Sequence, residues 1–122
     1  MNRYKTVVEV KFDESSKIGD CFQSALKAWR IYQPTKIIAE NQNLTDDHIQ
    51  ELCGFLQDRA MVSDLNLRRN QISNAGAIAL GEFISQYDET LTHLDITRNR
   101  IGQKGGQAIL NALKANTRII EC

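Results

Sequence analysis

One pattern of apolar residues occurs twice in the second half of the chain. Each copy alternates apolar and polar residues, reaches an asparagine and continues to one more apolar residue. The first copy contains Val62, Leu65, Leu67, Asn70 and Ile72, and the second contains Leu91, Leu94, Ile96, Asn99 and Ile101. Each residue of the first copy lies 29 positions before its counterpart in the second copy. A chain with a period of this length folds by stacking copies of one supersecondary unit.

The repeat extends beyond these segments in both directions. After the asparagines, the two copies agree at Gly76, Ala79, Leu80, Phe83 and Ile84, and at Gly105, Ala108, Ile109, Ala112 and Leu113. An earlier copy, 28 positions upstream, has Ile37, Ala39, Gln42, Leu44, Leu52, Phe55 and Leu56, with Gln42 in the asparagine place. A fainter first copy has Val10, Phe12, Ile18, Leu26 and Trp29. Downstream, Ile119 and Cys122 lie 28 positions after Leu91 and Leu94 and are expected to begin a fifth strand.

The first half of each unit is expected to be a strand that ends in a turn. Leu65 and Leu67 alternate with polar residues, which indicates a strand with one buried face. Asn70 departs from this alternation, so we expect it to satisfy backbone groups in the turn by stacking against Asn99 of the next unit.

The second half of each unit is expected to be a helix that packs on the strand. Ser73 is a candidate N-cap, and Leu80 and Phe83 follow helical spacing. Gly76 and the Gly105–Gly106 pair are expected to allow close approach of backbones.

These residues resemble the leucine-rich repeat family, and the unit length is similar to that of its ribonuclease-inhibitor-like subfamily. The resemblance implies an α/β solenoid, a short horseshoe with parallel strands on the concave face and helices on the convex face. It implies a single domain over residues 1–122, with an irregular capping repeat at 1–33, repeats at 34–61, 62–90 and 91–118, and a further strand at 119–122. The family hosts inhibitors, immune sensors, GTPase activators, actin-filament caps and bacterial effectors, so the fold does not specify the function.

The composition limits the classes of partner and compartment. The chain has 15 Lys and Arg against 15 Asp and Glu, so we expect neither a nucleic acid nor a membrane as the main partner. No stretch reaches the length of a membrane helix, and no apolar signal core opens the chain, so we expect a cytoplasmic protein. Cys21, Cys53 and Cys122 have no metal-ligand spacing and are expected to be reduced thiols.

The polar strand residues are expected to form an array on the concave face. In a parallel sheet, equivalent positions form columns across the strands. One column is Glu9, Lys36, Asp64, His93 and Glu121, a second is Lys11, Ile38, Asn66 and Asp95, and a third is Asp13, Glu40, Arg68 and Thr97. Asn41, Arg69 and Arg98 lie at the strand ends.

This array predicts a partner-binding site with arginine anchors. Its members are Glu40, Asp64, Asn66, Arg68, Arg69, His93, Asp95, Thr97 and Arg98. Arg68, Arg69 and Arg98 are the expected anchors, because arginine binds carboxylates and phosphates bidentately and is enriched at interface hot spots. The alternative is a solvated charge ladder in which Arg68 pairs with Glu40 across adjacent strands.

No arrangement of residues favours catalysis. Phosphate-loop, HExxH and GxSxG motifs are missing. His48 and His93 fall in different parts of the repeat and are not expected to meet, and Cys53 lacks an orienting partner for nucleophilic chemistry. We therefore expect no enzyme activity, no cofactor and no metal.

The sequence thus favours a module that binds a protein partner through the concave face. A second hypothesis is a regulator of a small GTPase, resembling the Ran GTPase-activating proteins. A third is an assembly unit, with a homodimer formed through Ile119 and Ile120 at an uncapped edge.

Overall fold

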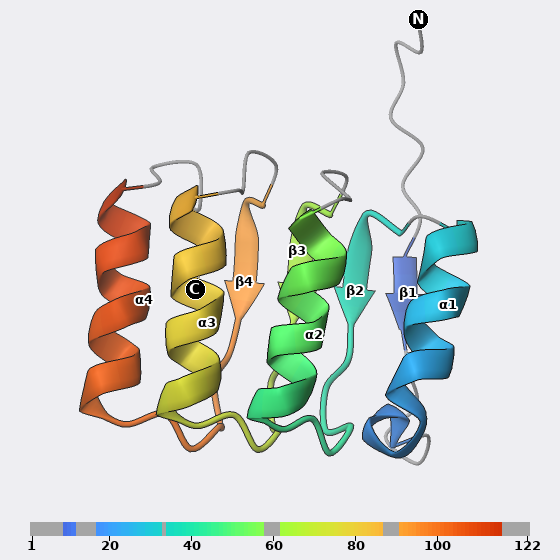
Figure 1. Cartoon of the computed structure of the whole chain (residues 1–122), viewed down its shortest axis with the longest axis horizontal. Coiled ribbons are helices and arrows are strands. Elements are labelled where there is room, and N and C mark those ends of the chain that lie inside the picture. The colour runs from blue at the N-terminus through green and yellow to red at the C-terminus, as the bar shows by residue number, and fades with distance from the viewer. Residues whose placement is uncertain (1–8, 12–16, 33, 58–61, 87–90, 116–122) are drawn as a thin grey trace, which may run out of the picture.

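Strands and helices alternate along the chain (Figure 1). The computed structural model describes residues 9–11, 17–32, 34–57, 62–86 and 91–115. The strands are β1 (Glu9–Lys11), β2 (Lys36–Ile38), β3 (Asp64–Asn66) and β4 (His93–Asp95). The helices are α1 (Phe22–Tyr32), α2 (Asp46–Gln57), α3 (Asn74–Gln86) and α4 (Gln103–Ala115), and a 3-10 helix, η1 (Ile18–Cys21), precedes α1. Each described strand is followed by one helix, as the repeat predicts.

The strands form one parallel sheet in which each strand residue pairs with the equivalent residue of the next repeat. Their order is β1-β2-β3-β4, and the helices cover one side of the sheet (Figure 1). Ile37 lies opposite Leu65, and Leu65 lies opposite Leu94. Equivalent residues therefore sit beside one another, which places Asp64 next to His93. The predicted solenoid of parallel strands and helices is confirmed.

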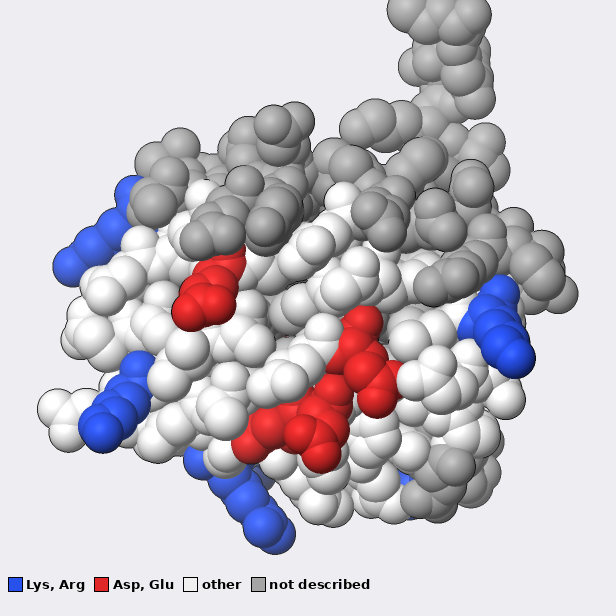
Figure 2. All heavy atoms as spheres, in the orientation of Figure 1, with Lys and Arg blue, Asp and Glu red and all other residues white. Residues whose placement is uncertain are grey.

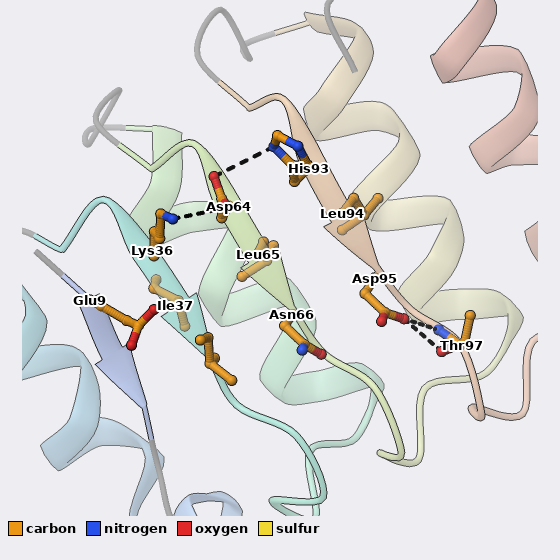
Figure 3. A pocket seen from close by; sticks show the side chains of 11 residues that line it. Glu9, Lys36, Ile37, Asp64, Leu65, Asn66, His93, Leu94, Asp95 and Thr97 are labelled. Atoms are coloured by element: carbon orange, nitrogen blue, oxygen red, sulfur yellow. Dashed lines mark hydrogen bonds and ion pairs between the residues drawn. The ribbon is translucent and has the colours of Figure 1, made fainter. Parts of the chain in front are cut away.

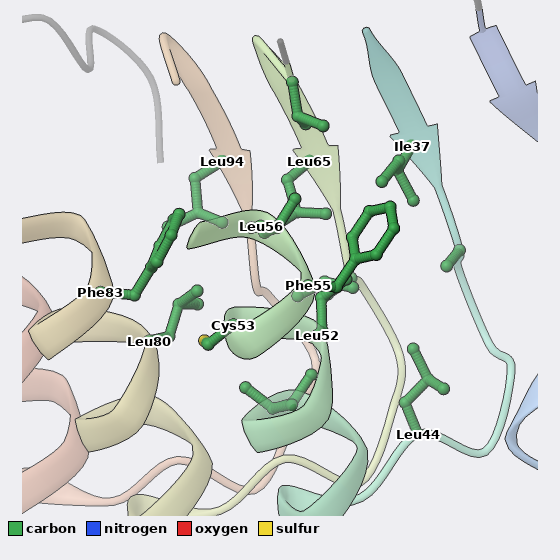
Figure 4. Packing of buried hydrophobic residues seen from close by; sticks show 14 of the residues in the cluster. Ile37, Leu44, Leu52, Cys53, Phe55, Leu56, Leu65, Leu80, Phe83 and Leu94 are labelled. Atoms are coloured by element: carbon green, nitrogen blue, oxygen red, sulfur yellow. The ribbon is translucent and has the colours of Figure 1, made fainter. Parts of the chain in front are cut away.

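A single apolar layer fills the space between the sheet and the helices (Figure 4). Ile37, Leu65 and Leu94 extend from the strands and are at most 2% exposed. They meet helix residues such as Leu52 and Phe83, which are also buried. Burying these faces removes apolar surface from water at about 25 cal/mol per Å², so each repeat is stabilised mainly by its neighbours.

Aromatic side chains close the amino-terminal end of this layer. Trp29 is 1% exposed, and its ring centroid lies 6.1 Å from that of Phe22 and 6.0 Å from that of Phe55. Phe22 and Trp29 thus pack in the core from the repeat that is expected to cap the chain, whereas Phe12, of the same repeat, lies outside the described residues.

The last described repeat is less completely covered than the repeat before it. Ile101 is partly exposed, whereas its counterpart Ile72 is fully buried. The predicted fifth strand at 119–122, which includes Ile119 and Ile120, lies outside the described residues. The homodimer through these two residues stays a prediction.

Asn70 organises the turn between β3 and α3. Its Oδ1 accepts the N–H groups of Gln42, at 2.9 Å, and Leu44, at 3.0 Å, in the preceding repeat. Its Nδ2 donates to the carbonyl groups of Ala39 and Leu67, both at 2.9 Å. One buried amide thus satisfies backbone groups of two repeats.

The same contact recurs one repeat later. Asn99 Oδ1 accepts the N–H groups of Asn70 and Ile72, both at 3.1 Å. The expected role of asparagine in the turn is confirmed. The expected stacking of the two side chains is replaced by bonds from one side chain to the backbone of the preceding turn, because the unpaired N–H groups lie there.

Helix starts are capped across repeats. Asp46 Oδ1 accepts the N–H groups of Ser73, at 2.7 Å, and Gly76, at 3.0 Å. The Ser73 carbonyl accepts the first helical bond, from Ala77, so Ser73 occupies the predicted N-cap position. Its hydroxyl, however, donates to Asp46 Oδ2, and Asp46 of the preceding repeat supplies the capping oxygen instead.

Asn74 repeats this arrangement for α4. Its Oδ1 accepts the N–H groups of Gly102, at 2.8 Å, and Gly105, at 2.9 Å. A Cβ at Gly105 would lie 2.9 Å from this oxygen, whereas a Cβ at Gly106 would meet nothing within 4 Å. The expected close approach holds for Gly105 and is wrong for Gly106.

Removing the Asn70 amide tests the turn contacts. We expect Asn70→Ala to lower the free energy of unfolding by about 2–4 kcal/mol, because it leaves several buried backbone groups without partners. Urea unfolding followed by circular dichroism measures this loss. Asn111→Ala, an exposed change on α4, should alter stability by less than about 0.5 kcal/mol. Equal losses from the two variants would contradict the role of Asn70.

Asp46 makes stability dependent on pH. Burial raises the pKa of Asp46, but hydrogen bonds from the Ser73 hydroxyl and from the Ser73 and Gly76 N–H groups outweigh this effect. The folded pKa therefore lies below the ordinary value of about 3.9. Such a group stabilises the fold above its ordinary pKa, and the contribution is lost as pH falls through the folded value.

The variant Asp46→Asn keeps an oxygen acceptor and removes the titration. We expect it to be less stable than wild type near pH 7, with the difference shrinking as pH falls below the ordinary pKa of about 3.9. Urea midpoints measured across this range provide the test. Asp47→Asn is the matched control, since Asp47 is exposed, and a convergence as large as that of Asp46→Asn would argue against the capping contact.

Candidate functional site

The side of the sheet that the helices leave uncovered, here called the strand face, contains a hollow of about 390 Å³. All four strands contribute to it (Figure 3). Ile37, Leu65 and Leu94, at the middle of β2, β3 and β4, line the floor of the hollow, while their buried side chains belong to the core. The described lining residues are Glu9, Lys36, Ile37, Ile38, Asp64, Leu65, Asn66, His93, Leu94, Asp95 and Thr97.

Asp64 stands between two basic groups. Its Oδ2 lies 3.8 Å from Lys36 Nζ, and its Oδ1 lies 3.7 Å from His93 Nδ1 (Figure 3). The Ser63 hydroxyl donates to Oδ1 at 2.9 Å. The side chains of Lys36, Asp64 and His93 are 31–41% exposed, and partly solvated pairs of this length contribute at most about 1 kcal/mol. Asp64 can therefore exchange these partners for a cation brought by another molecule.

Asp95 and Asn66 are oriented by their own turns. Asp95 Oδ1 accepts the N–H of Thr97 at 3.0 Å and its hydroxyl at 2.6 Å. Asn66 Oδ1 accepts the N–H of Arg68 at 3.0 Å. These local bonds fix both side chains before any partner arrives, so binding them costs little further conformational entropy.

The hollow carries a net negative charge. Among its described lining residues, Glu9, Asp64 and Asp95 are acidic and Lys36 is basic, which gives −2 with His93 neutral. A low-dielectric wall behind such a group of carboxylates favours a cation.

The structure divides the predicted site residues into two sets. Asp64, Asn66, His93, Asp95 and Thr97 come together in the lining of the hollow. Glu40, Arg68, Arg69 and Arg98 are not among its described lining residues and occupy the ends of the strands and the turns that follow. The predicted anchors thus lie beside the hollow, and acidic groups lie within it.

The alternative pairing of Arg68 with Glu40 is not observed among the described residues, where the recorded ion pairs join Asp64 to Lys36 and to His93. The predicted site also omitted Glu9, Lys36 and Ile38, which line the hollow. The repeat places Glu9 and Lys36 in the column of Asp64, and Ile38 in the column of Asn66, so the spacing of the repeat identifies all three.

The remaining candidate groups have structural roles. His48 Nδ1 accepts the Thr45 N–H at 2.9 Å at the start of α2. His48 therefore contacts the backbone at a helix start, whereas His93 lies in β4. Burial raises the pKa of the Cys53 thiol to about 12, which keeps it protonated and unreactive. Within the described ranges, no group of three His, Cys, Asp or Glu side chains could hold a metal ion.

The helix-covered face has a different distribution of charge. Figure 2 shows acidic side chains gathered over α2 and basic side chains around the margins. The exposed acidic residues of α2 are Asp47 and Glu51. No described helix is long and apolar enough to span a membrane.

Comparison with known proteins agrees with this architecture. A family model described as Leucine Rich repeat matches residues 60–81 and again residues 87–110. The first segment contains β3 and α3 as far as Gly81, and the second contains β4 and α4 as far as Leu110. The chain has the leucine-rich repeat fold. The ribonuclease-inhibitor-like subfamily stays a prediction.

A solved structure also shares this leucine-rich repeat fold. The structure titled leiomodin-1 actin-binding site 2 superposes with a TM-score of 0.79 and 23% sequence identity, over 93% of this chain and 68% of that chain. The search of curated proteins gave no match. At this identity the neighbour shares the fold, and neither it nor the repeat match indicates an enzymatic family.

Proposed function

We propose that this leucine-rich repeat chain is a non-catalytic module that binds a protein partner on its strand face. The observation that carries the proposal is the acidic hollow, which spans all four described strands. Side chains on paired strands are preorganised, and preorganisation lowers the entropic cost of association.

The charge of the hollow selects the kind of group that enters it. A lysine or arginine of the partner would bind Asp64 and Asp95, whose carboxylates are accessible from the strand face. Ile38, which is partly buried at the lining, would contact the aliphatic part of that side chain. Asn66, His93 and Thr97 would supply polar contacts that select among partners.

The hollow accounts for only part of such a contact. Stable protein interfaces bury about 800 Å² on each partner, which is more than four short strands provide. The partner would therefore extend over the neighbouring turns, where Glu40 lies.

Reversing the charge of Asp64 tests the strand face. We expect Asp64→Lys to weaken partner binding by at least about tenfold, because it places a repulsive charge where a cation binds. Immobilised wild-type, Asp64→Lys and Glu82→Lys chains would be incubated with cell extract, and the retained proteins quantified by mass spectrometry. Glu82 is exposed on α3, so Glu82→Lys makes the same charge change on the helix face.

The expected result is a set of proteins retained by wild type and by Glu82→Lys and lost from Asp64→Lys. Circular dichroism of the three chains controls for folding, and Asp64→Asn provides a milder change with less risk to the fold. Equal retention by all three chains would place the binding surface elsewhere.

Actin is a second, more specific candidate partner, and the actin-binding neighbour of similar fold supports testing it. The wild-type chain should cosediment with actin filaments, as should Glu82→Lys, whereas Asp64→Lys should remain in the supernatant. If wild type does not cosediment, actin is excluded as a partner, and the cell-extract experiment still decides whether the strand face binds another protein.

A further inference from the structure

Four arginines lie at the edge of the molecule where the strands end and the helices begin. Arg68 and Arg69 follow β3, and Arg98 and Arg100 follow β4 at the equivalent part of the next repeat. We call these four residues the arginine edge. Arg69, Arg98 and Arg100 are exposed, and Arg68 is partly exposed.

The turns that carry these charges are directly bonded to each other. The Arg69 N–H donates to the Thr97 carbonyl at 3.0 Å, so Arg69 lies beside the turn of Arg98. Neighbouring strands are about 4.8 Å apart, and like charges at such positions repel each other. Stacking the repeats therefore concentrates positive charge at this edge.

The described part of the chain does not neutralise this charge. Neither recorded ion pair includes an arginine of the edge. Arg68 Nε is buried and, among the described groups, has no hydrogen-bond partner. A buried donor of this kind costs about 1–3 kcal/mol when unsatisfied, so the protein itself gives this guanidinium little stabilisation.

Two of the arginines also occupy an unfavourable backbone conformation. Arg69 has φ of 59° and Arg98 has φ of 57°, both in the left-handed region. The equivalent residue of the second repeat is Asn41, with φ of 55°, and asparagine tolerates this conformation better than arginine does. At two successive repeats, the chain thus has arginine where asparagine would fit the turn more easily.

The start of α4 adds to the positive potential of this edge. The N-terminus of a helix carries a partial positive charge, α4 has no acidic residue in its first turn, and it is capped by the uncharged amide of Asn74. At the start of α3 the Asp46 carboxylate, which accepts hydrogen bonds from Ser73 and Gly76, offsets this charge.

We propose that the arginine edge is a second binding site, and that it takes an acidic segment of a protein partner. Guanidinium groups spread over two repeats match several carboxylates along an extended chain, each of which can accept two parallel N–H bonds. The net charge of zero for the whole chain disfavours a nucleic acid, whose binding depends on neutralising many phosphates. The site does not require that the acidic hollow bind anything.

A short fluorescein-labelled oligoglutamate peptide is the probe, with fluorescence anisotropy as the readout at low salt. The test variant is the double substitution Arg69→Asn/Arg98→Asn, which places at both turns the residue that the second repeat has at this position. The matched control is Lys27→Gln/Lys114→Gln, which removes the same charge from exposed positions on α1 and α4. Asp64→Lys, in the hollow, is the third variant.

Wild type, the lysine variant and Asp64→Lys should bind the peptide, with affinity that falls as salt rises. The arginine variant should bind at least about tenfold more weakly and have a urea midpoint equal to or above that of wild type, because asparagine relieves the backbone strain. This combination of retained stability and lost binding would not result from a purely structural role.

Several results would overturn the proposal. Undetectable binding by wild type, an equal loss in the lysine and arginine variants, or tighter binding of a short single-stranded RNA than of the peptide would each do so. Binding by the arginine variant as tight as that of wild type would place the peptide elsewhere on the chain. Failure of the strand-face proposal leaves this test unaffected, because the oligoglutamate probe and the arginine variant address residues outside the hollow.

Discussion

The fold depends on polar side chains that satisfy the backbone of a neighbouring repeat. Asn70 and Asn99 each accept two N–H groups from the turn before them. Turns carry backbone groups that no strand or helix pairs, and burying them unpaired would cost more than the apolar core could offset. Because each asparagine serves the preceding repeat, no repeat completes its hydrogen bonds alone, and stability is shared along the stack.

The helix starts follow the same rule. Asp46 caps α3 and Asn74 caps α4, each from the repeat before. The two positions are equivalent in the repeat, yet one has a carboxylate and the other an amide. The Asn74 amide accepts at every pH, whereas the cap that the Asp46 carboxylate provides for α3 weakens when this carboxylate is protonated.

The constraint that stacks the turns also arranges the charges. Because equivalent residues of successive repeats pair in the sheet, Lys36, Asp64 and His93 share one column. The same pairing places Arg69 beside the turn of Arg98. The result is an acidic hollow in the middle of the strand face and a basic edge at the strand ends. A partner with charges of both signs would be oriented as well as bound, because complementary charge contributes specificity and association rate more than affinity.

The sequence by itself determined the architecture, because the spacing of apolar residues within each repeat is enough to predict its strand and its helix. Alternation at Leu65 and Leu67 specifies a strand, helical spacing specifies the segment through Leu80, and the offset between copies specifies which residues share a column. These features need only the pattern of apolar residues, and the structure has them.

Tertiary structure decided the contacts between residues far apart in the sequence. Asp46 accepts from Ser73 across 27 positions, and local cap rules point to Ser73 itself. The placement of the arginines beside the hollow depends on the left-handed backbone at Arg69, a position at which glycine or asparagine is the usual residue. The repeat pattern assigns each charge a position in its unit, but only the packed backbone decided which charges face one another.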